Sequence, residues 1–308
     1  MKNLLKAAII SVGLLISTST LATDYPSKDI RIIVPFGAGG GTDSVAKALA
    51  SNTKAILGKN IRIINRTGGA GSIGMSYGAK MRPDGYTLTV VTREIASLPQ
   101  MGLMQHTVED FKLIRMVNLD PALIIVSADS PFNSVKDLVE AAKKNPGAIQ
   151  FASTAAPNFY LMALEKNQGI KLDAIPHNGA AEAIPSIIEH DTQVTMITPG
   201  EALPQIRKGR LKVLGVMSEQ RIAYLPDVPT LKEQGFNITS ATWRGIGAPK
   251  DTPEAVIKIL GEAFDKAMAS PEFKKVMADG AMTPYPLKEK EFTDFVKEDI
   301  KKLSILIN

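Results

Sequence analysis

The chain has 308 residues, 44% of them hydrophobic and 22% charged, so it is long enough for about two domains and too apolar to be disordered. It contains no cysteine, which excludes disulfides, thiolate metal sites and a cysteine nucleophile. The net charge of +5 is small for this length and includes no long run of one sign. This charge gives no support to nucleic-acid binding.

Residues 1–22 have the features of a cleaved secretory signal peptide. Two lysines precede an apolar stretch, Ala7 to Ile16, and small polar residues then lead to Ala22. The apolar stretch is about half as long as a helix that crosses a bilayer. We therefore expect cleavage after Ala22 and export to the periplasm without a lipid anchor. Loss of the two lysines would lower the net charge from +5 to +3.

The first half of the chain alternates short β-branched runs with helical patterns. Strands are predicted over 30–35, 61–65 and 86–91, and helices over 43–57 and 72–82. A repeated strand-helix-strand order is typical of a parallel sheet that is covered by helices.

A second series of the same kind follows. Its predicted strands are 122–128, 149–153, 174–176, 193–197 and 211–217, and its predicted helices are 135–144, 159–168, 181–190 and 201–208. After a Pro-rich connection and an apolar stretch around 243–249, the chain is mainly helical to its end. This last part has too little strand for a third sheet. We therefore predict an α/β protein with one domain of residues 23–121 plus 243–308 and another of residues 122–242.

A glycine-rich turn, Val34 to Asp43, joins the first predicted strand to the first helix. Glycines let the backbone approach a ligand closely, and free amides at a helix N-terminus favour an anion. A dinucleotide fingerprint fails because Thr42 stands in place of its third glycine, and no Gly-Lys-Ser or Gly-Lys-Thr tripeptide is present. A tight turn without a ligand stays open as the alternative.

Two further strand-to-helix turns carry small and polar residues. Asn65 to Gly74 lies at the same predicted sheet edge as the first turn, and its segment Ala70 to Gly74 nearly matches a hydrolase nucleophile elbow. Ala70 replaces the first glycine of that motif, so Ser72 fits a helix cap better than a nucleophile. Ser153 to Asn158 opens a helix of the second series, so one turn from each domain could face the other across a cleft.

The histidines are scattered and show no metal-ligand spacing. His177, at the end of a predicted strand, can either touch a ligand or close a turn. Three arginines, Arg66, Arg93 and Arg244, can each hold a carboxylate in a bidentate pair, although an arginine is more often solvated.

A series of short segments points to one family. The segments are Ile33–Phe36 with Gly39–Asp43, Asn65–Arg66 with Gly68–Gly74, Pro83–Leu88, Ala128–Phe132, Gly209–Leu211, Leu225–Thr230, and Trp243–Gly245 with Ala248–Pro249. With these segments in order, from Tyr25 almost to the C-terminus, the chain resembles the periplasmic solute-binding proteins of the tripartite tricarboxylate transporter family, also called the Bug family.

The resemblance implies a two-domain periplasmic-binding-protein fold of the type II-like kind, each domain a sheet flanked by helices, with the ligand cleft between the domains. Such a protein closes over a small organic carboxylate, needs no cofactor or metal, catalyses nothing, is a monomer and delivers its ligand to a membrane permease. The residues expected to contact the ligand are Phe36, Gly37, Ala38, Gly39, Gly40, Thr42, Asp43, Thr92, Arg93, Ser153, Thr154, Ala155, Asn158, His177, Asn178, Gly179 and Ala180.

The sequence departs from the family pattern in the second domain. Ala155, Ala156 and Pro157 replace the usual Ser- and Gly-rich loop, and Asn178-Gly179 replaces a common Lys-Gly. The ligand class therefore stays open among dicarboxylates, tricarboxylates, aromatic acids and amino acids. Two other functions also stay open: a secreted hydrolase that uses Ser72 or Ser153 near His177, and an orphan receptor that feeds a membrane sensor.

Overall fold

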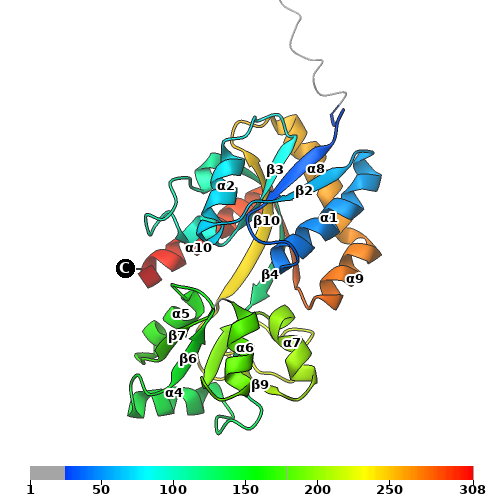
Figure 1. Cartoon of the computed structure of the whole chain (residues 1–308). Helices are drawn as coiled ribbons and strands as arrows, with labels where there is room; N and C mark the ends of the chain where they lie inside the picture. The colour runs from blue at the N-terminus through cyan, green and yellow to red at the C-terminus, as the bar shows by residue number, and fades with distance from the viewer. Residues whose placement is uncertain (1–24, 178, 308) are drawn as a thin grey trace, which may run out of the picture.

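The structure is a computed structural model that describes residues 25–177 and 179–307. The predicted signal peptide and Asn178 lie outside the described residues. The strands form two separate sheets, each covered by helices on both faces, and these give the molecule two lobes (Figure 1). This arrangement confirms the predicted α/β class.

The six-stranded lobe contains the sheet β11-β4-β10-β3-β1-β2. Its strands are β1 (Ile30–Val34), β2 (Ile61–Asn65), β3 (Thr87–Thr92), β4 (Phe111–Pro121), β10 (Ala241–Pro249) and β11 (Pro284–Lys288). Strands β1, β2 and β3 run parallel, whereas β10 is antiparallel to β3 and β4. Every residue of β3 is buried, as expected for a central strand with helices on both faces.

Helices from distant parts of the chain cover this sheet. One face carries α1 (Gly41–Leu57), α8 (Glu254–Ala269) and α9 (Pro271–Asp279), and the other carries α2 (Ser72–Ala79), α3 (Glu94–Ser97) and α10 (Glu289–Ile307). Trp243 is fully buried on the α10 side, where the edges of Phe292 and Phe295 meet its ring.

The five-stranded lobe contains the sheet β7-β6-β8-β5-β9. Its strands are β5 (Leu123–Ser127), β6 (Gln150–Ser153), β7 (Asp173–Pro176), β8 (Val194–Ile197) and β9 (Leu211–Val216). Helices α4 (Val135–Lys144) and α5 (Phe159–Gln168) pack on one face, and α6 (Ala180–Ile188) and α7 (Pro199–Arg207) on the other. Local caps set these bounds: Ser134 and Asp137 form a capping box for α4, and Asn158 caps α5.

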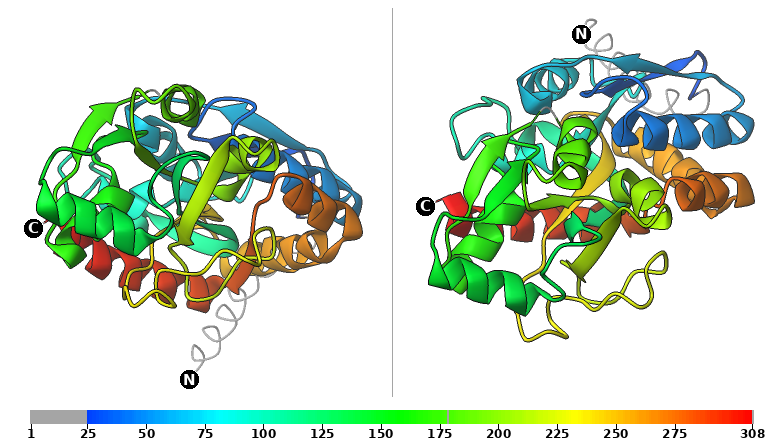
Figure 2. Two further views of the ribbon diagram at one scale, coloured as in Figure 1. Left: turned by 90° about the horizontal axis from the view of Figure 1, so that it is seen from below. Right: turned by 60° about the horizontal axis from the view of Figure 1, so that its bottom comes forward.

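Two kinds of connection join the lobes. The chain leaves the six-stranded sheet after Pro121 and returns to it in β10, and backbone hydrogen bonds link Ala122, Met217 and Ser240 at the crossing. The C-terminal helix α10 contacts β4 and α3 in one lobe and α5 in the other, and Figure 2 shows it, in red, reaching the green helices.

Some predicted bounds were wrong. The helix predicted over 72–82 ends at Ala79, and Lys80 is its C-cap residue. Strands β4 and β11 were not predicted. Charged residues such as Arg115 and Asp120 interrupt the apolar pattern of β4, and only their partners in the fold allow them to be buried. No described helix combines the length and the apolar character that a membrane span requires.

Candidate functional site

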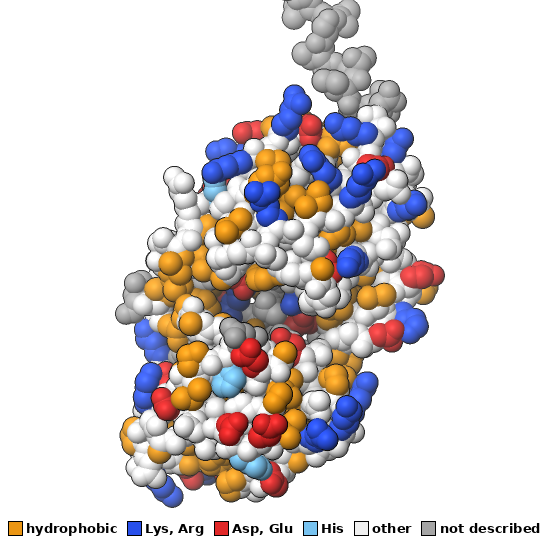
Figure 3. Space-filling view, viewed as in Figure 1, with side chains coloured by type: hydrophobic (Ala, Val, Ile, Leu, Met, Phe, Trp, Pro, Cys, Tyr) orange, Lys and Arg blue, Asp and Glu red, His pale blue; other side chains and the backbone are white. Residues whose placement is uncertain are grey.

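The loops at the ends of parallel strands bring the predicted residues together in two groups. Phe36–Gly40 follows β1 and Thr92–Arg93 ends the neighbouring parallel strand β3, so both lie at one edge of the six-stranded sheet. In the other lobe, Ser153–Ala155 lies at the end of β6, and His177, Gly179 and Ala180 follow the parallel strand β7. Figure 3 shows a hollow between the two lobes with acidic and basic side chains inside it. We call this hollow the interlobe cleft.

An internal carboxylate holds the β1–α1 loop in shape. Asp43 is 1% exposed, and its oxygens accept hydrogen bonds from the Gly39 N–H at 2.8 Å and from Asn65 Nδ2 at 2.9 Å. Lys47 pairs with it at 2.7 Å. Burial alone would raise the pKa of Asp43, but these partners together hold that pKa below its usual range. The Asp43 side chain therefore faces the protein, and it shapes the loop rather than pointing into the cleft.

The N-terminus of α1 offers amide donors beside this loop. Gly40 is the N-cap residue, and no described side chain caps the helix. The first N–H groups of a helix have no acceptor within the helix, so those of Gly41, Thr42 and Asp43 are available to another acceptor. Gly37 to Gly41 are exposed. The positive end of the helix dipole adds to the attraction for an anion at this point.

Arg244 lies directly beside these amides. It is on β10, opposite Thr92 of β3, and its Nε donates to Thr42 Oγ1 at 2.9 Å. Its Nη1 donates to Asp120 Oδ2 at 2.7 Å, and the Asp120 side chain is only 3% exposed. The remaining nitrogen, Nη2, approaches the position that a side chain at Gly41 would occupy. Arg244 therefore ties a crossing strand to the start of α1.

The side chain of Arg93 takes a different direction from the loop residues. Its Nη1 donates to Ser240 Oγ at 3.2 Å, and its Nε lies 3.5 Å from Asp299 Oδ2 on α10. The guanidinium also lies 5.7 Å from the ring of Phe159, at the start of α5. Arg93 thus joins the two lobes behind the crossing strands. Its neighbour Thr92 is buried and donates to Glu94 Oε2 at 2.5 Å.

In the five-stranded lobe, local hydrogen bonds shape the loop after β6. Ser153 Oγ donates to the Ala155 carbonyl at 2.7 Å, and Asn158 Oδ1 accepts from the N–H groups of Tyr160 and Leu161. Asn158 is 6% exposed, and its Nδ2 has no hydrogen-bond partner among the residues that the structure describes. Thr154 and Ala155 are more exposed. An unpaired buried donor in this position is available to a ligand oxygen.

Tyr160, in the first turn of α5, packs against the core of the five-stranded lobe, and charges from both lobes act on its hydroxyl. Burial raises the pKa of its hydroxyl, and the charges that act on that hydroxyl come from Arg93, Glu201, Glu94 and Arg244. Three of these charged residues belong to the six-stranded lobe. The hydroxyl makes no hydrogen bond with a described residue. It therefore stays protonated at neutral pH and is a hydrogen-bond donor.

The segment after β7 includes His177, which lines a separate hollow of the five-stranded lobe. His177 Nδ1 lies 2.9 Å from the Ile175 carbonyl, and the ring lines a shallow hollow together with Glu189 and Asp191. Gly179 is the N-cap of α6, with a positive φ of 85°, and Ala180 begins the helix without a side-chain cap. Asn178 lies outside the described residues. The described part of the chain contains no group of acidic or histidine side chains that could hold a metal ion.

Sequence reasoning left two residues of this region out of the predicted set. Arg244 had been noted only as one of three candidate cations, and its partner Asp120 is more than a hundred residues away in the chain. For Tyr160, the sequence pattern indicates only a position in the first turn of a helix, which does not predict a binding role. Arg66, another candidate cation, stacks on the ring of Tyr77 at 3.9 Å.

Two α/β lobes, joined by crossing strands and presenting loops and helix N-termini to one cleft, define a two-lobed solute-binding receptor. A family model described as "Tripartite tricarboxylate transporter family receptor" matches residues 45–308. The chain belongs to this family, which confirms the resemblance found in the sequence.

Individual relatives agree with this assignment. The "UPF0065 protein in gbd 5'region" of Cupriavidus necator is 30% identical, over 98% of this chain and 93% of that protein. The crystal structure of a TctC solute binding protein from Polaromonas has a TM-score of 0.82 and 33% identity, covering 92% of this chain and 99% of that one. The periplasmic binding protein BugD has a TM-score of 0.78 and 29% identity, with 92% and 97% covered.

Proposed function

We propose that this receptor captures a small organic carboxylate in the periplasm, by closure of its lobes, and delivers it to a membrane permease. The observation that carries the proposal is the uncapped N-terminus of α1, where exposed glycines and the amides of Gly41, Thr42 and Asp43 lie beside Arg244. Amides and a guanidinium directed at one point favour a negatively charged group.

The second lobe supplies the opposing contacts. Asn158 Nδ2 and the Tyr160 hydroxyl are donors that have no partner in the described part of the chain, and both come from the loop and first turn that follow β6. A ligand held by donors of both lobes binds the closed form more tightly than the open form, and this difference drives closure. Within this proposal, Phe36 to Gly40 and Thr42 provide one wall, and Ser153 to Asn158 with Gly179 and Ala180 provide the other.

The proposal includes no reaction. A hydrolase would need a serine activated by a base. Ser153 Oγ instead donates to the Ala155 carbonyl, and His177 Nδ1 faces the Ile175 carbonyl, so each group is engaged locally. A thermal-shift and calorimetric screen tests both functions together. The protein from residue 23 onward, unfolded and refolded to release any bound ligand, is screened against mono-, di- and tricarboxylates, aromatic acids, amino acids and neutral controls, and against ester and amide substrates.

Binding at a hundred times the dissociation constant should stabilise the protein by about 2.7 kcal/mol. A matched pair of variants locates the site. Gly37 has open space around its Cβ position and no positive φ, so both Gly37→Asp and Gly37→Asn are expected to fold. The aspartate places a negative charge before α1 and should weaken carboxylate binding by at least about tenfold, whereas asparagine should not. Turnover of an ester without any carboxylate shift would contradict the proposal.

Export and delivery need separate tests. N-terminal sequencing of the protein from a periplasmic extract should begin at Thr23. Cross-linking in intact cells should recover a permease, whereas recovery of a sensor kinase alone would favour the sensor function instead.

A further inference from the structure

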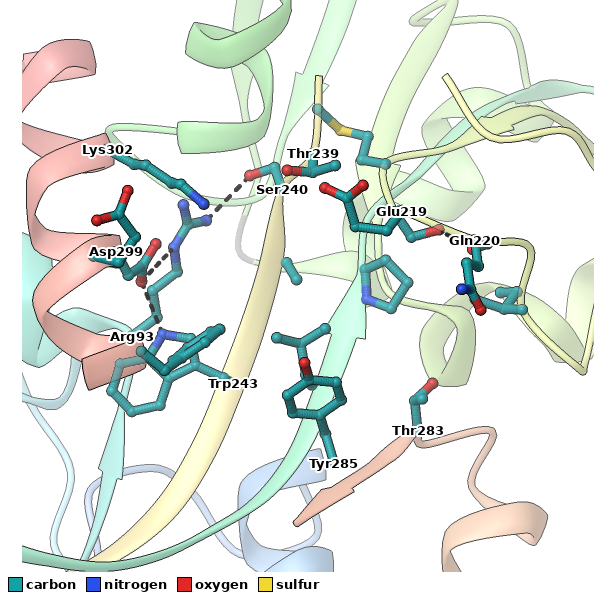
Figure 4. A pocket seen from close by; sticks show the side chains of 18 of the residues that line it. Arg93, Glu219, Gln220, Thr239, Ser240, Trp243, Thr283, Tyr285, Asp299 and Lys302 are labelled. Atoms are coloured by element: carbon teal, nitrogen blue, oxygen red, sulfur yellow. Dashed lines mark hydrogen bonds and ion pairs between the residues drawn. The ribbon is translucent and has the colours of Figure 1, made fainter. Parts of the chain in front are cut away.

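A second cavity lies on the opposite side of the crossing strands from Arg244. Side chains alternate along β10, so Arg244 faces the start of α1 while Trp243 faces α10. On the Trp243 side the two lobes enclose a cavity of about 550 Å³ (Figure 4). We call it the rear cavity. It is lined by α10, by the residues around Ser240 and by the loop 217–223 of the five-stranded lobe.

The walls of the rear cavity are mainly apolar. Trp243, Tyr285, Phe295 and Leu119 line its six-stranded side. Tyr285 is 43% exposed, and the centre of its ring lies 6.4 Å from the centre of the Phe295 ring. Cavities of a few hundred cubic ångströms that have aromatic walls and a few polar groups are the usual form of small-molecule sites. Such a wall suits a ring or a short hydrocarbon chain.

At the rim of the rear cavity, the acidic side chains are paired with cations, whereas one lysine has no such partner among the described side chains. The acidic side chains have cationic partners: Glu219 pairs with Lys232, Glu298 lies 3.8 Å from Lys301, and Asp299 lies 3.5 Å from Arg93. Asp299 also accepts a hydrogen bond from Trp243 Nε1 at 2.8 Å.

Lys302 differs from these residues because it has no hydrogen bond or ion pair with any described residue. Figure 4 shows it extending from α10, and it lines the cavity together with Arg93 and Ser240. The Thr283 hydroxyl at the opposite wall is buried, and it too has no hydrogen-bond partner within residues 25–177 and 179–307. Lys302 and Thr283 therefore offer an ammonium and a hydroxyl, and both can donate to an anion.

We propose that the rear cavity is a second binding site, separate from the interlobe cleft, for an amphipathic monocarboxylic acid. The carboxylate lies between Lys302 and the Ser240 hydroxyl, which accepts from Arg93 Nη1 and still has its own O–H to donate. The apolar body lies against Trp243 and Tyr285. This site does not depend on the proposed function of the cleft, because the two share no donor.

The only tryptophan of the chain is Trp243, so its fluorescence reports on the rear cavity directly. The refolded protein is titrated with 4-phenylbutyrate, and in parallel with 4-phenylbutanol and 4-phenylbutylamine. The acid should give a saturable change, the alcohol a weaker one, and the amine the weakest. No saturable change with the acid, or an amine that binds as tightly as the acid, would overturn the proposal.

Variants separate the two sites. Lys302→Gln should weaken binding of the acid by about three- to tenfold, the size expected for one partly exposed charge-assisted contact. Tyr285→Ala should weaken the acid and the alcohol alike. Lys297→Gln removes an exposed charge from the same helix outside the cavity and serves as the matched control. If Gly37→Asp abolishes the signal while Lys302→Gln leaves it intact, the acid binds in the cleft and the second site does not exist.

Discussion

The ion pair between Arg244 and Asp120 should be a main support of the cleft. In Arg244→Met, Asp120 loses its charged partner at 2.7 Å, although Asn118 Nδ2 and the Thr283 N–H still donate to it. Loss of one charge-assisted hydrogen bond costs about 1.5–3 kcal/mol, and loss of the bond to Thr42 adds about 1 kcal/mol. We therefore expect destabilisation of about 3 kcal/mol, which corresponds to a fall in Tm of about 6–12 °C.

Urea unfolding of a double-mutant cycle measures this interaction. Asp120→Asn should cost less than Arg244→Met, because Arg244 is 12% exposed and can turn to water, and because Asn118 Oδ1 is an unused acceptor nearby. The double variant should be more stable than the sum of the two losses predicts, by about 1.5–3 kcal/mol. If the stability loss of the double variant equals the sum of the two single losses to within about 0.5 kcal/mol, the coupling between Arg244 and Asp120 is refuted.

Three further predictions concern the loops and the packing beside the cleft. Asp43→Asn should lower stability at neutral pH by about 1–3 kcal/mol. Because the folded-state pKa of Asp43 is lowered, its contribution to stability is present above its unfolded pKa of about 3.9 and is lost as the pH falls below that value. In urea unfolding at acid pH, the free energies of unfolding of Asp43→Asn and of the unmodified protein should therefore converge. Asn158→Ala should lower the free energy of unfolding by about 1 kcal/mol, because it removes the cap of α5. Asn158→Asp keeps the cap and should lower ligand affinity with little loss of stability. Equal affinities of Asn158→Asp and the unmodified protein in calorimetry would count against a ligand contact of Asn158. Gly78→Ala would place a Cβ 1.9 Å from Thr89 Oγ1 and should cost about 1–3 kcal/mol, part of which Thr89→Ala recovers; a neutral Gly78→Ala in urea unfolding would contradict this packing.

Elements with local signals could be predicted from the sequence. The predicted helix over 159–168 coincides with α5, because Asn158 starts it and Gly169, in the left-handed conformation, ends it. The strand predicted over 61–65 also coincides with the observed strand β2. The family assignment also came from local segments, because many short motifs occur in the same order.

Features that depend on distant partners could not be predicted. Strand β4 carries two buried charged residues, Arg115 and Asp120, whose ion-pair partners are Asp265 on α8 and Arg244 on β10. The inward direction of the Asp43 side chain depends on Asn65 from another strand. Arg93 is close in sequence to the cleft residues, yet its side chain turns to Asp299 on the C-terminal helix. Sequence spacing places a residue on a loop, but it does not give the direction of the side chain.

The most direct test of the account is the distance between the lobes with and without ligand. The chain has no cysteine, so spin labels can be placed at chosen positions without background. Lys54→Cys on α1 and Lys208→Cys after α7 are exposed sites on different lobes, and Lys54→Cys with Lys274→Cys on α9 is a control pair within one lobe. Pulsed electron spin resonance should show a shorter distance between the lobes when the carboxylate identified by the screen is added, with the control distance unchanged. A saturating carboxylate that leaves the distance distribution between the lobes unchanged would contradict capture by lobe closure.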